Sequence, residues 1–295
     1  MPSVRPRPTV AARERAARPF LLAALVALAF LLAGTVRAQA ILVAPQGVVL
    51  DARTRTASVE LYNPGDRASE VALSTLYGYP VSTADGEITL RTVEHPDSAE
   101  RSAAGFIEAF PRRLVLQPGQ RQTVRLLARP PQGLAAGEYW ARLVVAAKDA
   151  APAAADTAGD GVRVGLTLEV RTIIAVNYRT GPLATGIALG APDVALRGDS
   201  VVVRVPMTRT GDAAWIGATS VRLEPDDATV AAPPEQRLQT AVYTTLAPRL
   251  VFPRSALARG RWRVRIVASS DRPDVVQRTH LRAAAAQAET TLVVP

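Results

Sequence analysis

The sequence contains no cysteine, which excludes both a disulfide scaffold and a thiol nucleophile. Only two histidines occur, His95 and His280, and neither lies in an H-E-x-x-H motif or in a paired-ligand spacing. Glycine patterns of the Gly-x-Ser-x-Gly, Walker or dinucleotide-binding kind are missing as well. These absences predict a protein that is not an enzyme, holds no metal or cofactor and has no small-molecule substrate.

Lysine is also scarce, and the positive charge is concentrated at one end of the chain. Residues 1–40 hold six arginines and one glutamate, so residues 41–295 carry 29 basic and 25 acidic side chains, a net charge of +4. Lys148 is the only lysine, and no basic run alternates with aromatic residues as in a nucleic-acid-binding groove. We therefore expect no nucleic acid among the partners.

The N-terminus has the order of a secretory signal peptide. Five arginines precede an apolar run over residues 20–33, and Ala38-Gln39-Ala40 follows with the small residues that signal peptidase requires. The run is shorter than the roughly 20 residues of a membrane-spanning helix. We expect cleavage after Ala40 and export of the remainder. An uncleaved signal that anchors the chain in the inner membrane is the alternative.

Short runs rich in β-forming residues, broken by turn residues, fill the rest of the chain. The expected strands cover residues 47–50, 56–62, 70–76, 87–93, 121–127, 139–146 and 162–176, then 200–207, 215–223, 239–246, 249–252, 261–268 and 289–294. Asn63-Pro64-Gly65-Asp66, Asp85-Gly86 and Pro118-Gly119 supply turns between them. Seven or more short strands at this spacing predict an antiparallel β-sandwich of the immunoglobulin type.

The strand pattern stops and restarts at Gly181-Pro182, a pair that breaks a strand ladder and suits a short linker. We therefore expect an all-β protein with two immunoglobulin-like β-sandwich domains in tandem. The expected division is a signal peptide at residues 1–40, a first domain at 41–180 and a second domain at 181–295. The alanine-rich residues 281–288 predict a helical turn before the last strand.

One stretch alternates between apolar and other residues without a break. Its apolar positions, which fall on one face of a strand, are Val162, Val164, Leu166, Leu168 and Val170. It follows a loop of small residues at 150–160. Two interpretations are open: the five side chains face the core of their own domain, or they form a surface that lends a strand to a partner.

Five sequence blocks occur in a fixed order through the first domain. They are ILVAPQGVVL at residues 41–50, ASVELYNPG at 57–65, FPRRLVLQPGQRQTVR at 110–125, GEYWARLV at 137–144, and the alternating stretch that closes with Tyr178-Arg179. In this order they resemble the amino-terminal domain of PapD-like periplasmic chaperones, which assemble pili by the chaperone–usher route. The block at 110–125 is the most specific of the five.

The resemblance implies a periplasmic chaperone-like protein that binds incompletely folded β-rich secreted or pilin-type subunits by donor-strand addition. Its donor residues are then Val162, Val164, Leu166, Leu168 and Val170. An outer-membrane usher is a second partner that the resemblance implies.

The family's anchor for the subunit's terminal carboxylate does not carry over. An arginine and a lysine form it, and their positions fall here at Gln46 and at Ile173 or Ala175. Arg171 is the nearest candidate carboxylate anchor, provided that the register shifts by an even number of residues. The missing pair favours the alternative function of a non-enzymatic structural or adaptor component of a cell-envelope or surface assembly.

Overall fold

The computed structural model of the chain describes residues 40–97, 99–150, 168–275 and 279–295. The expected signal peptide and three of the expected donor residues (Val162, Val164 and Leu166) lie outside these ranges. Within them every regular element is a strand except one 3-10 turn, η1 (Arg254–Ala256). No helix in the described part is long and apolar enough to cross a membrane. The expected all-β class is confirmed.

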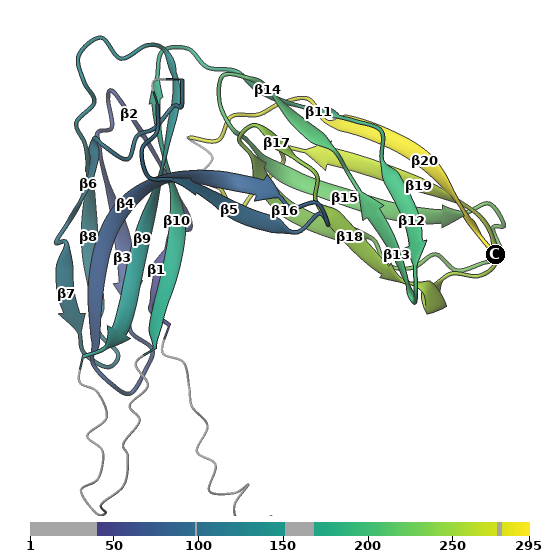
Figure 1. The fold of residues 1–295 in the computed structure, drawn as a ribbon, viewed down its shortest axis with the longest axis horizontal. Coiled ribbons are helices and arrows are strands. Elements are labelled where there is room, and N and C mark those ends of the chain that lie inside the picture. The colour runs from purple at the N-terminus through teal and green to yellow at the C-terminus, as the bar shows by residue number, and fades with distance from the viewer. Residues whose placement is uncertain (1–39, 98, 151–167, 276–278) are drawn as a thin grey trace, which may run out of the picture. The chain divides into compact units, whose positions relative to one another are not determined.

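Strands β1 to β10 form a sandwich of two sheets (Figure 1). The smaller sheet has the order β1-β3-β8-β6, made of β1 (Leu42–Ala44), β3 (Thr56–Tyr62), β8 (Arg121–Ala128) and β6 (Ile107–Phe110). The larger sheet has the order β2-β10-β9-β4-β5, with β7 also paired to β4. Its strands are β2 (Gly47–Asp51), β10 (Glu169–Thr180), β9 (Gly137–Asp149), β4 (Ser69–Ser82), β5 (Ile88–Val93) and β7 (Arg113–Leu116). These pairs are antiparallel, with β2–β10 the parallel exception.

Alternating side chains build the core between the two sheets. In β3, Val59 and Leu61 are fully buried while the intervening Glu60 is exposed. The inward residues of both sheets meet in one apolar cluster, to which β10 contributes Ile174 and Val176. The period of two in the sequence therefore fixes which side of each strand faces the core.

Asn63 ties two of the expected turns together. It is fully buried, and its Nδ2 donates hydrogen bonds to Arg67 O (2.7 Å) and to Leu116 O (3.0 Å). Its Oδ1 accepts the Gly65 N–H (3.0 Å), and its backbone O accepts the Gly119 N–H (2.9 Å). Because both side-chain groups are satisfied, the buried amide fixes the turns after β3 and after β7 relative to each other.

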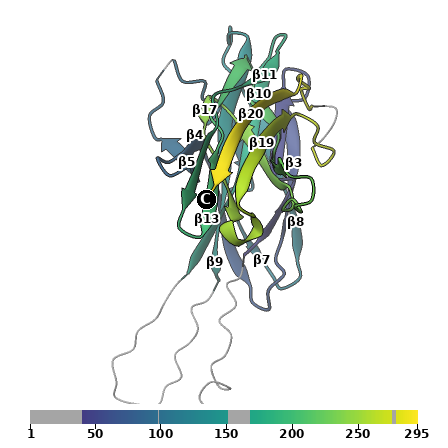
Figure 2. The same cartoon turned by 90° about the vertical axis from the view of Figure 1, so that its right-hand side faces the viewer.

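Strands β11 to β20 form a second sandwich of three sheets. The sheets are β11 (Thr185–Leu189) with β14 (Met207–Gly211) and β17 (Thr245–Leu246), then β12 (Asp193–Arg197) with β13 (Ser200–Arg204) and β18 (Arg249–Pro253), and finally β16 (Gln236–Val242), β15 (Trp215–Pro225), β19 (Gly260–Ser269) and β20 (Ala286–Val294). Figure 2 shows β19 and β20 side by side. Trp215, Trp262 and Phe252 fill the core of this sandwich. The exact domain bounds, 41–180 and 181–295, stay a prediction.

The expected helical turn at residues 281–288 is wrong. Residues 281–285 have no regular structure, and Ala286 begins β20 opposite Ala268 of β19. The cross-strand pairing that completes this sheet outweighs the helix propensity of alanine, which amounts to less than about 1 kcal/mol per residue.

Candidate functional site

The first half of β10 lies at an edge of the larger sheet. On one side β9 pairs with the whole of β10, from Glu169 opposite Lys148 to Thr180 opposite Gly137. On the other side β2 pairs only with residues 175–179. Within the described ranges, no strand pairs with this second side of residues 169–174.

The main-chain groups of this half-strand point alternately to β9 and to the open side. The Ala175 N–H donates to Gln46 O (3.3 Å), so Ala175 faces away from β9. Since the direction alternates along an antiparallel ladder, the N–H and C=O groups of Glu169, Arg171 and Ile173 face the same way as those of Ala175. Such a row of unpaired groups is a template for another strand.

The even-numbered side chains of β10 emerge from the core toward its start. Ile174 and Val176 are at most 1% exposed, Val170 is half-buried, and Leu168 is 53% exposed. The end of β10 therefore packs in the core of the sandwich, whereas its described beginning does not, and both interpretations of residues 162–170 stay open. Of the five expected donor residues, the structure describes only Leu168 and Val170.

The positions expected for a carboxylate anchor lie together, but neither carries a charge. Gln46 contacts Ala175 through its backbone, and its side-chain Nε2 donates to Val43 O (2.7 Å). Arg171 lies four residues before Ala175, roughly 13 Å along a strand. Its Nε donates to the exposed Glu169 Oε1 (2.6 Å).

Arg142 of β9 is a cation that the sequence analysis did not single out. It lies directly opposite Ala175, so both side chains project from the same face of the sheet. Arg142 is only 5% exposed; its Nε donates to Gly78 O (2.9 Å) and its Nη1 to the Tyr243 hydroxyl (3.1 Å). Its Nη2 is buried and finds no hydrogen-bond partner in the described part of the chain. A guanidinium with only neutral partners and a free donor has the capacity to bind an anion.

Glu138, at the start of β9, is a buried acid that hydrogen bonds link to this arginine through Asn177 and the Tyr243 hydroxyl. Its Oε1 accepts hydrogen bonds from Trp140 Nε1 (3.1 Å), Asn177 Nδ2 (3.2 Å) and the Ala214 N–H (2.9 Å). Its Oε2 accepts the Arg179 Nε–H (2.6 Å). The carboxylate is therefore fully satisfied, and it joins β9, β10 and the residue that precedes β15.

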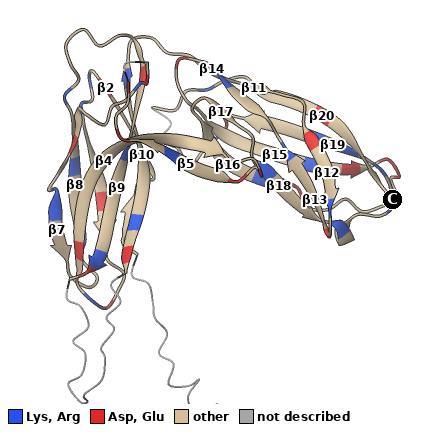
Figure 3. Cartoon of the chain, viewed as in Figure 1, with Lys and Arg blue, Asp and Glu red and all other residues tan. Residues whose placement is uncertain are grey.

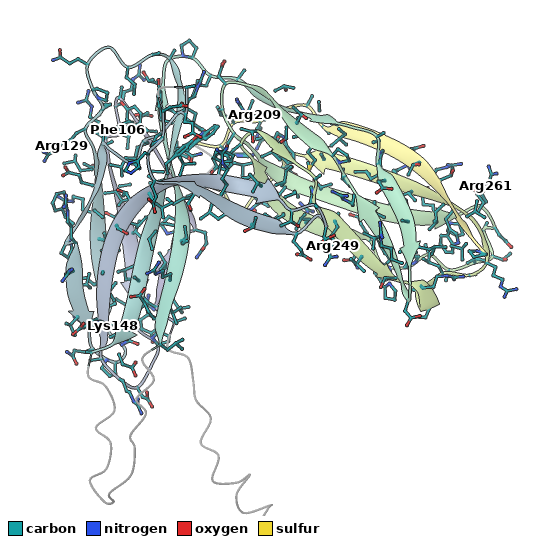
Figure 4. The ribbon with its side chains drawn as sticks, viewed as in Figure 1. Phe106, Arg129, Lys148, Arg209, Arg249 and Arg261 are labelled. Atoms are coloured by element: carbon teal, nitrogen blue, oxygen red, sulfur yellow. The ribbon has the colours of Figure 1, made fainter. Side chains whose placement is uncertain are left out.

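The ring of Tyr243 packs against the Arg142 guanidinium. The guanidinium lies 4.6 Å from the centre of the Tyr243 ring, which itself packs edge-on against Trp140 at 4.9 Å. Burial raises the pKa of Tyr77, which stacks on Trp140. Loss of hydration on burial also lowers the pKa of Arg209, labelled in Figure 4. In both residues burial is the main cause of the shift.

The strands of the larger sheet carry residues of both charge signs, as Figure 3 shows. A hollow of about 570 Å³ lies over β4, β7 and β9, lined by residues that include Val115, Ala146 and the ion pair of Lys148 with Glu70 (3.1 Å). Lys148 is labelled in Figure 4. Across the described residues, no group of three or more His, Asp or Glu side chains is placed to hold a metal ion.

Comparison with known proteins gives matches among solved structures. No protein-family model matches the chain, and no curated protein sequence matches it. The YadV chaperone is 15% identical over 85% of this chain and 99% of its own length, with a TM-score of 0.42. A complex of the SafA pilin with the SafB chaperone of Salmonella enterica matches at 12% identity, over 86% of this chain and 98% of that chain, with a TM-score of 0.40. The CsuC–CsuE chaperone–adhesin subunit complex of Acinetobacter baumannii matches at 11% identity, over 85% and 97%, with a TM-score of 0.41. These three solved structures are thus similar to the chain at 11–15% sequence identity.

Proposed function

We propose that this chain is a periplasmic, non-enzymatic chaperone-like protein that binds incompletely folded β-rich secreted or pilin-type subunits by strand addition along the first half of β10. The observation that carries the proposal is the open side of β10, where the main-chain groups of Glu169, Arg171 and Ile173 have no strand partner among the described residues. Leu168 and Val170 add apolar side chains at the same place. A subunit that lacks one strand of its own sheet satisfies both needs, since its main chain completes the ladder and its core covers the apolar side chains.

The position of β2 limits how an added strand lies. β2 occupies the edge of β10 from Ala175 to Arg179, so a partner strand extends from Ile173 toward Glu169 and ends near Gln46. The alternation before β10 extends the proposed donor surface to Val162, Val164 and Leu166. Six residues of β10, from 169 to 174, give an added strand about 20 Å of ladder.

A charged end of the partner strand needs a cation near Gln46. Arg171 is the anchor expected from the sequence, but it lies far along the strand and pairs with Glu169. We propose Arg142 as the stronger candidate, because it lies directly opposite Ala175 and keeps an unused donor. Its Nη2 is enclosed in the free protein, so binding there requires the Tyr243 ring to move.

Substitution of Ile173 by proline tests strand addition through the main chain. The Ile173 N–H faces the open side, so proline removes a donor for the partner and leaves the ladder with β9 intact. Ile173→Ala is the matched control, because it shortens the same side chain and keeps the N–H. Proteins that co-purify with the wild type from the periplasm, identified by mass spectrometry, serve as the binding probes.

We expect Ile173→Pro to weaken capture of these subunits at least about 10-fold, the equivalent of 1.4 kcal/mol or one to two hydrogen bonds, and Ile173→Ala to retain it. Circular dichroism establishes that both variants are folded. Capture by folded Ile173→Pro at the wild-type level contradicts strand addition. That outcome supports the alternative of a structural or adaptor component that binds through another face. Binding to an outer-membrane usher is measured separately, with the usher's purified periplasmic domains.

A further inference from the structure

The hairpin of β4 and β5 extends beyond the sheet that β4 belongs to. The first part of β4, from Ser69 to Leu76, pairs with β9. The second part, from Tyr77 to Ser82, pairs only with β5. We call residues 77–93 the arm. Because a two-stranded hairpin alone is marginally stable in water, the arm needs support from elsewhere in the molecule.

The tip of the arm is bonded to the second sandwich. The Arg249 N–H donates to Gly86 O (3.0 Å), and the Ala247 N–H donates to Ser82 Oγ (2.7 Å). The Arg249 guanidinium also pairs with Glu87. Ala247 directly follows β17, and Arg249 is the first residue of β18 (Figure 1); Figure 4 labels Arg249.

The base of the arm is held by aromatic packing. Tyr77 and Tyr79 are 3% and 6% exposed and lie in one cluster with Trp140 and Tyr243. Tyr243 belongs to the second sandwich, directly after β16. The arm therefore contacts the second sandwich at two places, one apolar and one polar.

Gly86 permits the close approach at the tip. Its φ is +81°, and a Cβ on it would lie 3.0 Å from Arg249 Cβ and 3.2 Å from Ala247 O. Gly119 has a similar φ of +69°, but a Cβ there would meet nothing within 4 Å. Only at Gly86 does an added methyl both strain the turn and push against the second sandwich.

We infer that the arm is a latch, a conformational device built into the fold. Its tip holds the segment from Ala247 to Arg249, and through that segment the second sandwich, in one position against the first. Two hydrogen bonds from backbone N–H groups and one exposed ion pair hold the tip. The exposed ion pair contributes little to the stability of this contact. A single substitution at the tip therefore releases the tip, while the aromatic contact at the base of the arm and both cores stay in place.

Gly86→Ala, with Gly119→Ala as its matched control, tests the latch in the full chain. Both variants place a methyl group at a positive φ, but only the first disturbs the contact with Arg249. Hydrogen exchange of the Ala247 and Arg249 amides is the first measurement. The second is the distance between spin labels at Ser58→Cys and Thr291→Cys, two exposed positions, which the absence of native cysteine makes straightforward.

We expect the two amides to exchange at least about 10-fold faster in Gly86→Ala than in the wild type, and the label distance distribution to broaden. Gly119→Ala leaves both measurements at their wild-type values. Identical behaviour of the two glycine variants overturns the inference.

Ser82→Ala keeps the inference falsifiable if Gly86→Ala does not fold. It removes one hydrogen bond and leaves the backbone of the turn unchanged. The Ala247 amide then exchanges faster, and an unchanged rate overturns the latch.

Discussion

Replacement of Glu138 by glutamine tests the buried ion pair that joins β9 to β10. Glu138 is fully buried, and the side chain of its partner Arg179 is 11% exposed. Removal of one member of a buried pair costs about 3–5 kcal/mol, because the other charge stays buried without its partner. The glutamine oxygen can keep the three bonds at Oε1, but its NH2 group then faces the Arg179 Nε–H, donor against donor. We expect a loss near the lower end, about 3 kcal/mol, at pH 7.

Thermal unfolding followed by circular dichroism measures this loss. A decrease of about 3 kcal/mol lowers the Tm of a chain of this size by about 6–12 °C. Glu70→Gln is the matched control, since Glu70 pairs with Lys148 of the same β9 strand at 3.1 Å, with both side chains nearly half exposed. An exposed pair contributes at most about 1 kcal/mol, and added salt screens it, whereas the effect of Glu138→Gln persists in salt. Equal shifts of Tm in the two variants would refute the reasoning.

Three further predictions concern single side chains. Leu168→Arg leaves Tm nearly unchanged because Leu168 is 53% exposed, yet it abolishes subunit capture in a pull-down. Val176→Arg, at a fully buried position, unfolds the first sandwich. Unfolding of Leu168→Arg would contradict the open position of that residue. Arg142→Gln weakens capture of a subunit that ends in a carboxylate, and Arg171→Gln does not. Titration of both variants with the same subunit measures the two affinities. A larger loss of affinity in Arg171→Gln would restore Arg171 as the anchor. The hydrogen bond from Arg272 lowers the pKa of Asp274 to about 2 from 3.8, so the stabilisation that it gives is complete above pH 3.8 and is lost as pH falls through 2. Asp274→Asn therefore reduces the fall of Tm between pH 4 and pH 2. An unchanged slope of Tm against pH in this variant argues against the hydrogen bond.

Strands with strong alternation could be predicted from the sequence, because the period of two reports directly which side chains enter the core. The run expected at 56–62 is β3, and the run expected at 261–268 is β19 with one more residue at each end. The four-residue strands β6 and β7 were missed, since a proline after Phe110 interrupts their combined run. The extension of β4 to Ser82 was missed as well. Pro80 argues against a strand in sequence, and it is tolerated where the strand has a partner on only one side.

The candidate site divides in the same way. The apolar alternation that leads into β10 is visible in the sequence, but the length of its open side depends on where β2 stops, which is a property of the sheet. Arg142 looks like an ordinary outward residue of a strand in the sequence. Its burial depends on Tyr243, 101 residues further along the chain. The alternation of apolar and polar residues along one strand carries no information about such a distant contact.

Residue-resolved amide exchange along β10, in the free chain and in its complex with a captured subunit, tests strand addition most directly. In the free chain we expect fast exchange at Arg171 and Ile173, which face the open side, and slow exchange at Thr172 and Ile174, which face β9. Subunit binding should then slow exchange at Arg171 and Ile173 to the level of their neighbours. Fast exchange at Arg171 and Ile173 in a complex that is otherwise fully formed would contradict the proposal.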